Sequence, residues 1–155
     1  MDKRQCATHF VGMTTAKPFP ARSPAEKVDG LVYFGRMLDK IRAHAKGELP
    51  ADWSANLGKG FDGRCLRFLG LKYEDLVERV LSEDGTDEEI LRWALAHGHN
   101  RSEDDMALWS EFMRKCGWND EITPTLERRK RESGLEQRDD IQTMFQYIDV
   151  DEGRL

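Results

Sequence analysis

Helix-start signals followed by apolar residues at helical spacing recur along this chain of 155 residues. The segment Thr86-Asp87-Glu88-Glu89 has the capping-box pattern, in which side chains bond the exposed amides of a helix start. Ser102 precedes three acidic residues, which the helix dipole favours in a first turn. Ser23-Pro24-Ala25-Glu26 combines a hydroxyl cap, a proline and a glutamate. The sequence therefore predicts an all-α fold with helices starting at Ser23, Thr86 and Ser102.

These helices are expected to form one compact domain. The spacing predicts six or seven helices around one core over residues 23–155, preceded by an extended N-terminal arm, 1–22, with no periodicity. The first helix is expected to end near Ala45. Six residues are predicted to be buried together: Leu38, Ile41, Trp93, Trp109, Phe112 and Phe145. The alternative is an α+β fold with a small hairpin near residues 49–60.

Composition and charge exclude several classes of protein. No apolar run approaches the roughly 20 residues that span a bilayer, and the N-terminus lacks the apolar stretch of a signal peptide, so we expect a cytoplasmic protein with no membrane partner. The net charge of -5 argues against general nucleic-acid binding. The basic run 128–131 is flanked by glutamates and is interpreted as a solvated helix face.

The charge is distributed unevenly along the chain. Residues 1–67 carry 12 Lys and Arg against 7 Asp and Glu, whereas residues 68–155 carry 12 against 22. One interpretation is that the two halves attract each other within one domain. The other is that the basic half receives an anion.

Neither a metal site nor a nucleophile stands out. Cys6, Cys65 and Cys116 are widely spaced and form no CxxC, so we expect reduced thiols and no metal ligands. Arg64 and Arg67 flank Cys65, but no identifiable base accompanies it. The glycines of residues 58–63 lack the features of a phosphate-binding loop and indicate a turn. No cofactor is indicated.

The strongest candidate surface is the far side of the first helix. Long cationic side chains gather there, and Gly30 and Gly35 suggest the close approach of a neighbouring helix, loop or ligand. The alternative interpretation is that this face of the helix is simply exposed to solvent. The predicted ligand-binding residues are Arg22, Arg36, Asp39, Lys40, Arg42 and Arg64.

Several motifs in order resemble a known family. They are Arg22-Ser23-Pro24, Arg36 to Ala43, Gly47, Asp87 with Trp93, the Trp109 helix, Asp140 to Phe145 and Ile148 to Arg154. This pattern resembles the bacterial family called domain of unknown function 5069 (DUF5069) over about residues 18–154. That family usually has two adjacent glycines where this chain has Asp29-Gly30. The resemblance implies one domain over this range and names no reaction.

Two functions remain open from the sequence. The preferred one is a non-catalytic binding module, in which the first helix and the 49–63 loop hold an anionic small molecule or an acidic segment of a partner protein. The alternative is a small enzyme whose site assembles from Arg36, Asp39 and Lys40, with Arg64 or Cys65.

Overall fold

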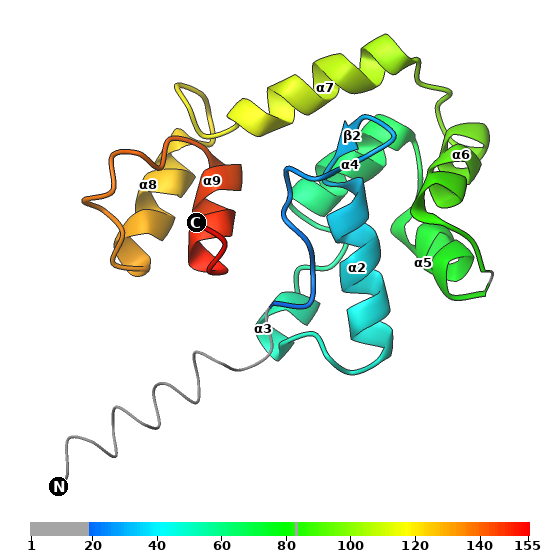
Figure 1. Cartoon of the computed structure of the whole chain (residues 1–155), viewed down its shortest axis with the longest axis horizontal. Helices are drawn as coiled ribbons and strands as arrows, with labels where there is room; N and C mark the ends of the chain where they lie inside the picture. The colour runs from blue at the N-terminus through cyan, green and yellow to red at the C-terminus, as the bar shows by residue number, and fades with distance from the viewer. Residues whose placement is uncertain (1–18, 83) are drawn as a thin grey trace, which may run out of the picture.

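A computed structural model describes residues 19–82 and 84–155 of the chain, shown in Figure 1. More than half of the described residues are helical, and the prediction of a predominantly helical domain is confirmed. The elements, in chain order, are β1 (Lys27–Val28), β2 (Leu31–Val32), α2 (Phe34–Ala45), α3 (Ala51–Ser54), α4 (Phe61–Leu69), α5 (Tyr73–Ser82), α6 (Asp87–His97), α7 (Glu103–Lys115), α8 (Thr123–Glu132) and α9 (Met144–Asp151).

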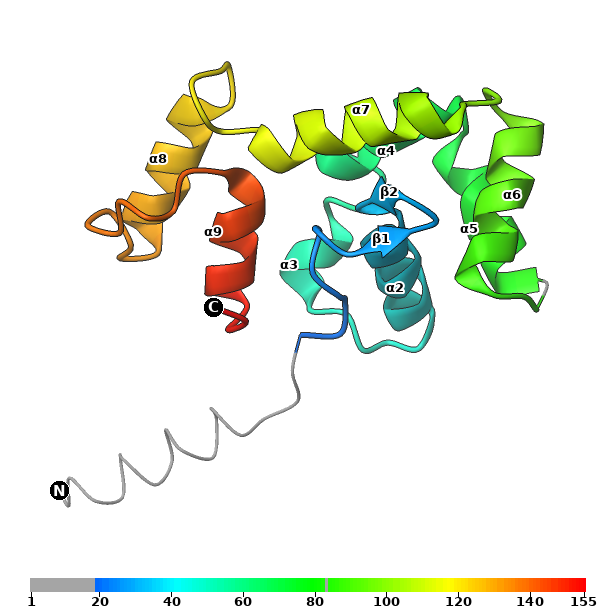
Figure 2. The same ribbon diagram turned by 45° about the horizontal axis from the view of Figure 1, so that its top comes forward.

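Helix α2 lies at the centre of this arrangement. Helices α5 and α6 pack on one side of it, and α4 and the short α3 lie behind and below it in Figure 1. Helix α7 runs across the top and connects this body to α8 and α9, which pack against each other on the other side. The view in Figure 2 shows the β1–β2 hairpin between α2 and α7.

The predicted helix starts at Thr86 and Ser102 are confirmed. The Thr86 hydroxyl accepts a hydrogen bond from the Glu89 amide, and Glu89 returns one from the Thr86 amide, which completes a capping box. Ser102 and Asp105 form a second box at the start of α7. A third, from Thr143 to Gln146, begins α9 and was not predicted.

The predicted helix start at Ser23 is wrong, because residues 24–33 form a turn and a hairpin before α2 begins at Phe34. The Ser23 hydroxyl donates to Asp149 instead of capping a helix. Asp29 and Gly30 have φ of 44° and 85°, so both central residues of the two-residue turn are left-handed. Asp-Gly between apolar residues is a strong hairpin signal, and here it outweighs the capping pattern.

The alternative hairpin near residues 49–60 is also wrong. That segment contains α3 and a series of turns, and the hairpin of the described chain pairs Val28 with Leu31 instead. Leu49 is buried and Trp53 is half-buried, so side chains anchor this segment without strand pairing.

The core has a large and a small part. Leu38, Ile41 and Phe145 are buried in the large cluster, and Trp93 and Trp109 pack against it half-buried. Phe112 was predicted to be buried, but it is 56% exposed, and the Arg64 guanidinium of α4 lies 5.9 Å from its ring centroid. The small cluster lies between α8 and α9 and contains Leu126, Ile141, Met144 and Tyr147.

The predicted N-terminal arm, 1–22, lies mostly outside the described residues. Within its last four residues, Ala21 is buried and Arg22 makes ion pairs. Cys6 also lies outside the described part of the chain. Among the described residues, no helix combines the length and the apolar character that crossing a bilayer requires.

The hairpin turn yields a first prediction. Replacing Gly30 by alanine meets no neighbouring atom, but it forces a Cβ onto a left-handed backbone, which costs about 1 kcal/mol. We expect G30A to lower the free energy of unfolding by this amount, measured by urea titration. Asp29→Gly, which keeps the left-handed geometry, is the control and should not destabilise the fold. An unchanged urea midpoint for G30A would contradict this account of the turn.

Candidate functional site

A cleft of about 480 Å³ lies between the central body and the α8–α9 pair. Helices α2 and α4 and the segment 53–60 form one wall, and α8 and α9 form the other. This volume is in the range of small-molecule sites. Basic side chains outnumber acidic ones in the lining: Arg36, Lys40, Lys59, Arg64, Arg67 and Arg129 against Asp151 and Glu152.

A buried ion pair joins the two walls at the base of the cleft. Arg36 donates two parallel hydrogen bonds to Glu152, at 2.8 Å from Nη1 to Oε1 and 2.6 Å from Nη2 to Oε2. The side chains are only 1% and 4% exposed. Burial alone would lower the pKa of Arg36, but its hydrogen bonds to Glu152 and the charge of that group outweigh burial and raise the pKa. Arg36 therefore stays charged and holds the end of α9 against α2.

A second buried network lies on the floor of the cleft. Lys40 Nζ is 2.6 Å from Asp62 Oδ1 and 3.1 Å from the Tyr33 hydroxyl, which itself donates to Asp62 at 2.7 Å. The other Asp62 oxygen accepts from the Gly58 amide, which ties the loop before α4 to this network. Burial lowers the pKa of Lys40, opposed by the charge of Asp62. Burial, and then Asp62, raise the pKa of Tyr33 well above its ordinary value.

The backbone of Tyr33 is unusual. It precedes the first residue of α2 with a φ of 72°, in the left-handed region that large side chains rarely adopt. The conformation turns the chain from β2 into α2 and directs the Tyr33 side chain toward Asp62. This strained residue contributes directly to the floor of the cleft.

Four other cations of the lining have no carboxylate partner among the described residues. Lys59, Arg67 and Arg129 are exposed, and no carboxylate oxygen of the described chain lies within 4 Å of their charged groups or of Arg64. The Arg64 guanidinium lies 5.8 Å from the Phe61 ring centroid and 5.9 Å from that of Phe112. Within the described residues, the rim of the cleft therefore carries positive charge without direct carboxylate pairs, although Asp151 lies in the same lining and feels the charge of Arg129.

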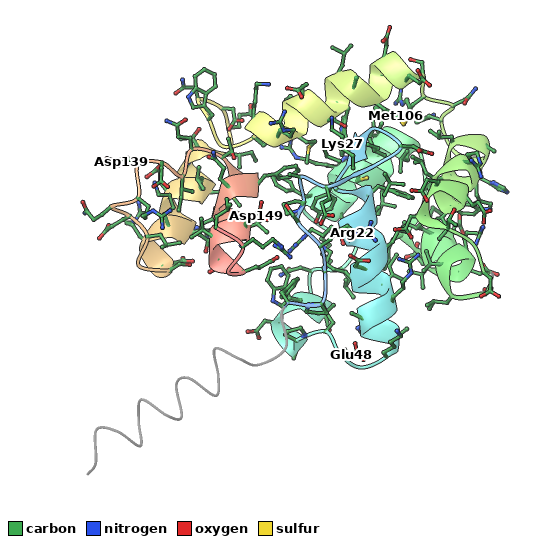
Figure 3. The ribbon with its side chains drawn as sticks, viewed as in Figure 1. Arg22, Lys27, Glu48, Met106, Asp139 and Asp149 are labelled. Atoms are coloured by element: carbon green, nitrogen blue, oxygen red, sulfur yellow. The ribbon has the colours of Figure 1, made fainter. Side chains whose placement is uncertain are left out.

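The remaining predicted site residues do not line the cleft and form a neighbouring network, which Arg36 joins by donating to the carbonyl of Arg22 at 3.0 Å. Arg22 donates hydrogen bonds to the Asp39 carboxylate from Nε at 2.8 Å and from Nη2 at 2.9 Å. Its Nη2 also donates to Asp87 at 2.6 Å. Arg42 bonds the other oxygen of Asp87 at 2.7 Å. Arg22, seen beside α2 in Figure 3, lies so close to Gly35 that a Cβ there would be 2.5 Å from it. The network ties the N-terminal segment and α6 to α2.

The structure thus divides the six predicted ligand-binding residues. Arg36, Lys40 and Arg64 line the cleft, whereas Arg22, Asp39 and Arg42 pair with one another and with Asp87. The face of α2 that bears Arg36 and Lys40 is buried under α4 and α9, so the alternative of a solvated face is wrong for these two residues.

Sequence reasoning missed several residues of the cleft. Glu152 and Asp62 are far from α2 in sequence, and no local pattern links them to it. Arg129 was assigned to a solvated face, and it does project into solvent, but at the rim of the cleft. The basic run 128–131 is therefore not a uniformly solvated face. Its next residue, Lys130, is buried and donates to the carbonyl of Ile141.

The two cysteines of the described chain, Cys65 and Cys116, are free, buried thiols. Burial raises the pKa of the Cys65 thiol, with Asp62 adding to the effect, so the thiolate is disfavoured. Within residues 19–82 and 84–155, no group of three or more potential ligands could hold a metal ion.

The buried ion pair leads to a second prediction. Arg36→Met removes the main partner of a buried carboxylate, so we expect the free energy of unfolding to fall by about 3–5 kcal/mol. The double variant R36M/E152M should recover part of this loss, because no fully buried charge is left unpaired and the partly exposed Arg154, which also bonds Glu152, keeps Asp149. Arg138→Met, which breaks an exposed pair with Asp140, is the control and should have little effect on the urea midpoint. Equal effects of R36M and R138M would contradict the proposed role.

The network of Arg22, Arg42 and Asp87 makes the free energy of unfolding depend on pH. Burial alone would raise the pKa of Asp87, but hydrogen bonds from Arg42 and Arg22 outweigh it and lower the pKa below its usual 3.8. The stability that the ionised Asp87 contributes is therefore fully present above its unfolded-state pKa. It is lost as the pH falls through its lower pKa in the folded protein. We expect Asp87→Asn to flatten the acid limb of a plot of unfolding free energy against pH below about 4. An acid limb as steep as in the wild type would exclude Asp87 as its source.

The family of the chain follows from its similarity to known sequences. No curated protein is significantly similar to the chain. A family described as a domain of unknown function, DUF5069, matches residues 18–154, a range that contains both walls of the cleft and the Arg22 network. Because the match spans nearly the whole length, the chain belongs to the DUF5069 family.

Proposed function

We propose that this chain is a binding module that takes an anionic small molecule into the cleft between α2–α4 and α8–α9. The observation that supports it is the contrast between the floor and the rim of the cleft. The floor cations, Arg36 and Lys40, are neutralised by Glu152 and Asp62. The rim cations Lys59, Arg64, Arg67 and Arg129 have no carboxylate within 4 Å in the described chain.

Charge and shape together favour an anionic ligand of small size. Guanidinium and ammonium groups that converge on a concave site attract phosphate or carboxylate groups, and arginine can bind them with two parallel hydrogen bonds. Apolar and aromatic side chains, including Trp53, Phe61 and Ile148, complete the walls. A mixed lining of this kind suits a ligand with a charged group and a less polar body. The acidic segment of a partner protein is the other occupant that this charge would accept.

Thermal denaturation with added anions tests the proposal. Inorganic phosphate, pyrophosphate, citrate and hexaglutamate would be compared at constant ionic strength, because a ligand that binds only the native state raises Tm. At a hundred times Kd the stabilisation is about 2.7 kcal/mol, or roughly 5–10 °C for a domain of this size. We expect a small anion to give such a shift. A shift with hexaglutamate alone would favour the partner segment, and no shift with any anion would contradict the proposal.

Variants at the rim test whether the cleft is the binding site. Arg129→Gln and Lys59→Gln should each reduce the increase in Tm that phosphate or pyrophosphate causes, while the Tm of the free protein changes little because both side chains are exposed. Arg128→Gln is the matched control, since Arg128 is an exposed neighbour on α8 that does not line the cleft. Equal losses for R128Q and R129Q would indicate a general effect of charge and not a site.

A further inference from the structure

The amino group of Lys40 occupies an exceptional position in this cleft. Lys40 lines the cleft, yet its side chain is only 8% exposed, whereas Lys59, the other lining lysine, is exposed. Its Nζ atom contacts two further polar groups, the Asp62 carboxylate and the Tyr33 hydroxyl, at hydrogen-bond distance. The amine and the phenol thus line the bottom of a site of ligand size, and the fully buried Asp62 carboxylate lies directly behind them.

This arrangement is costly for a protein that needs only stability. Desolvating an ammonium and a carboxylate costs several kcal/mol, and apolar residues of similar volume often stabilise such a site as well or better. Tyr33 adds a strained left-handed backbone at the same place. Strain and buried titratable groups cluster at functional sites because there they serve chemistry. Both features coincide on the floor of a cleft whose rim is cationic.

We propose that Lys40 reversibly captures the carbonyl group of the bound anion as an imine, so that the ligand class is a small aldehyde or ketone carrying a phosphate or carboxylate group. The proposal rests on the proposed function, because the rim cations Lys59, Arg64 and Arg129 would hold the anionic group. It adds a covalent role for the floor of the cleft, which anion binding alone does not require.

Asp62 accepts and returns the protons in each step of this reaction. Asp62 takes a proton from the Lys40 ammonium, and the freed lone pair of Nζ attacks the carbonyl carbon as the C=O π pair moves to oxygen. The oxygen takes the proton from Asp62. Asp62 then removes a second proton from nitrogen and passes it to the hydroxyl, which leaves as water while the nitrogen lone pair forms C=N. The products are a protonated imine and one water molecule, and addition of water reverses the sequence.

The electrostatics of the site favour this division of roles. Burial lowers the pKa of Lys40 and so enlarges its neutral, nucleophilic fraction, although the Asp62 charge opposes the effect. Burial and Asp62 raise the pKa of Tyr33, so the phenol keeps its proton and serves as a hydrogen-bond donor to Asp62 and not as a base. Tyr33 is therefore a positioning residue.

Reductive trapping on the full-length wild-type protein tests the proposal. Pyridoxal 5′-phosphate, which combines an aldehyde with a phosphate group, would be added at limiting concentration, followed by sodium borohydride to convert any imine to a stable amine. Peptide mass spectrometry would then locate the modified lysine. Burial lowers the pKa of Lys40, and the cationic rim gathers the anionic aldehyde at the cleft, so we expect Lys40 to be modified several-fold more than the exposed Lys46 and Lys72.

Competition and a variant connect the labelling to the site. Inorganic phosphate, at concentrations that raise Tm, should reduce labelling of Lys40 at least several-fold and leave Lys46 and Lys72 unchanged. Tyr33→Phe should slow labelling of Lys40 several-fold while the increase in Tm with phosphate persists, because the anion contacts are retained. A purely structural role for the hydroxyl would change the Tm of the free protein without this selective loss of labelling.

The outcomes separate this inference from the proposed function. Labelling confined to exposed lysines, together with a phosphate-induced increase in Tm, would overturn imine capture and leave anion binding intact. Absence of both effects would overturn the two proposals together. Labelling of Lys40 that phosphate fails to reduce would overturn the assignment of an anionic carbonyl ligand.

Discussion

The buried ion pair between Arg36 and Glu152 is the interaction on which the rest of the structure depends. It joins the central helix to the end of α9, two segments more than a hundred residues apart in the sequence. Arg154 also bonds Glu152 and reaches the carbonyl of Ala21, so the N-terminal segment is included in the same junction. Because both charges are desolvated, either one alone would be strongly unfavourable. Their mutual dependence keeps α9 in the place that makes it a wall of the cleft.

Helix α2 connects its neighbours through its own polar residues. Arg36 holds α9, Lys40 holds α4 through Asp62, and Asp39 holds the N-terminal segment through Arg22. Apolar residues of the same helix meanwhile fill the large core cluster. Helix α2 is therefore surrounded by protein on most of its circumference. Each of these three charged residues pairs with a different neighbouring segment.

Local chemistry could be predicted from the sequence, and tertiary partners could not. Capping at Thr86 and Ser102 depends on residues three positions apart, so the signal is complete within one turn. At Ser23 the capping pattern is equally complete, but no helix starts there. Asp29 and Gly30, both left-handed, form a tight hairpin turn in that segment instead. For the site, the cationic residues of α2 were identified, but a helical wheel assumes that polar means outward. Asp62 and Glu152 reverse that rule by supplying buried countercharges from distant segments.

The two hydrophobic clusters have a mechanical consequence. The α8–α9 wall packs around the small cluster, but Phe145 of α9 belongs to the large cluster, and Phe61 packs against both. A force that separates the walls therefore acts on the Arg36–Glu152 ion pair and draws Phe145 away from Tyr33 and Phe61. The compliance of the cleft is thus coupled to the packing of the large cluster, whereas the small cluster moves with its own wall.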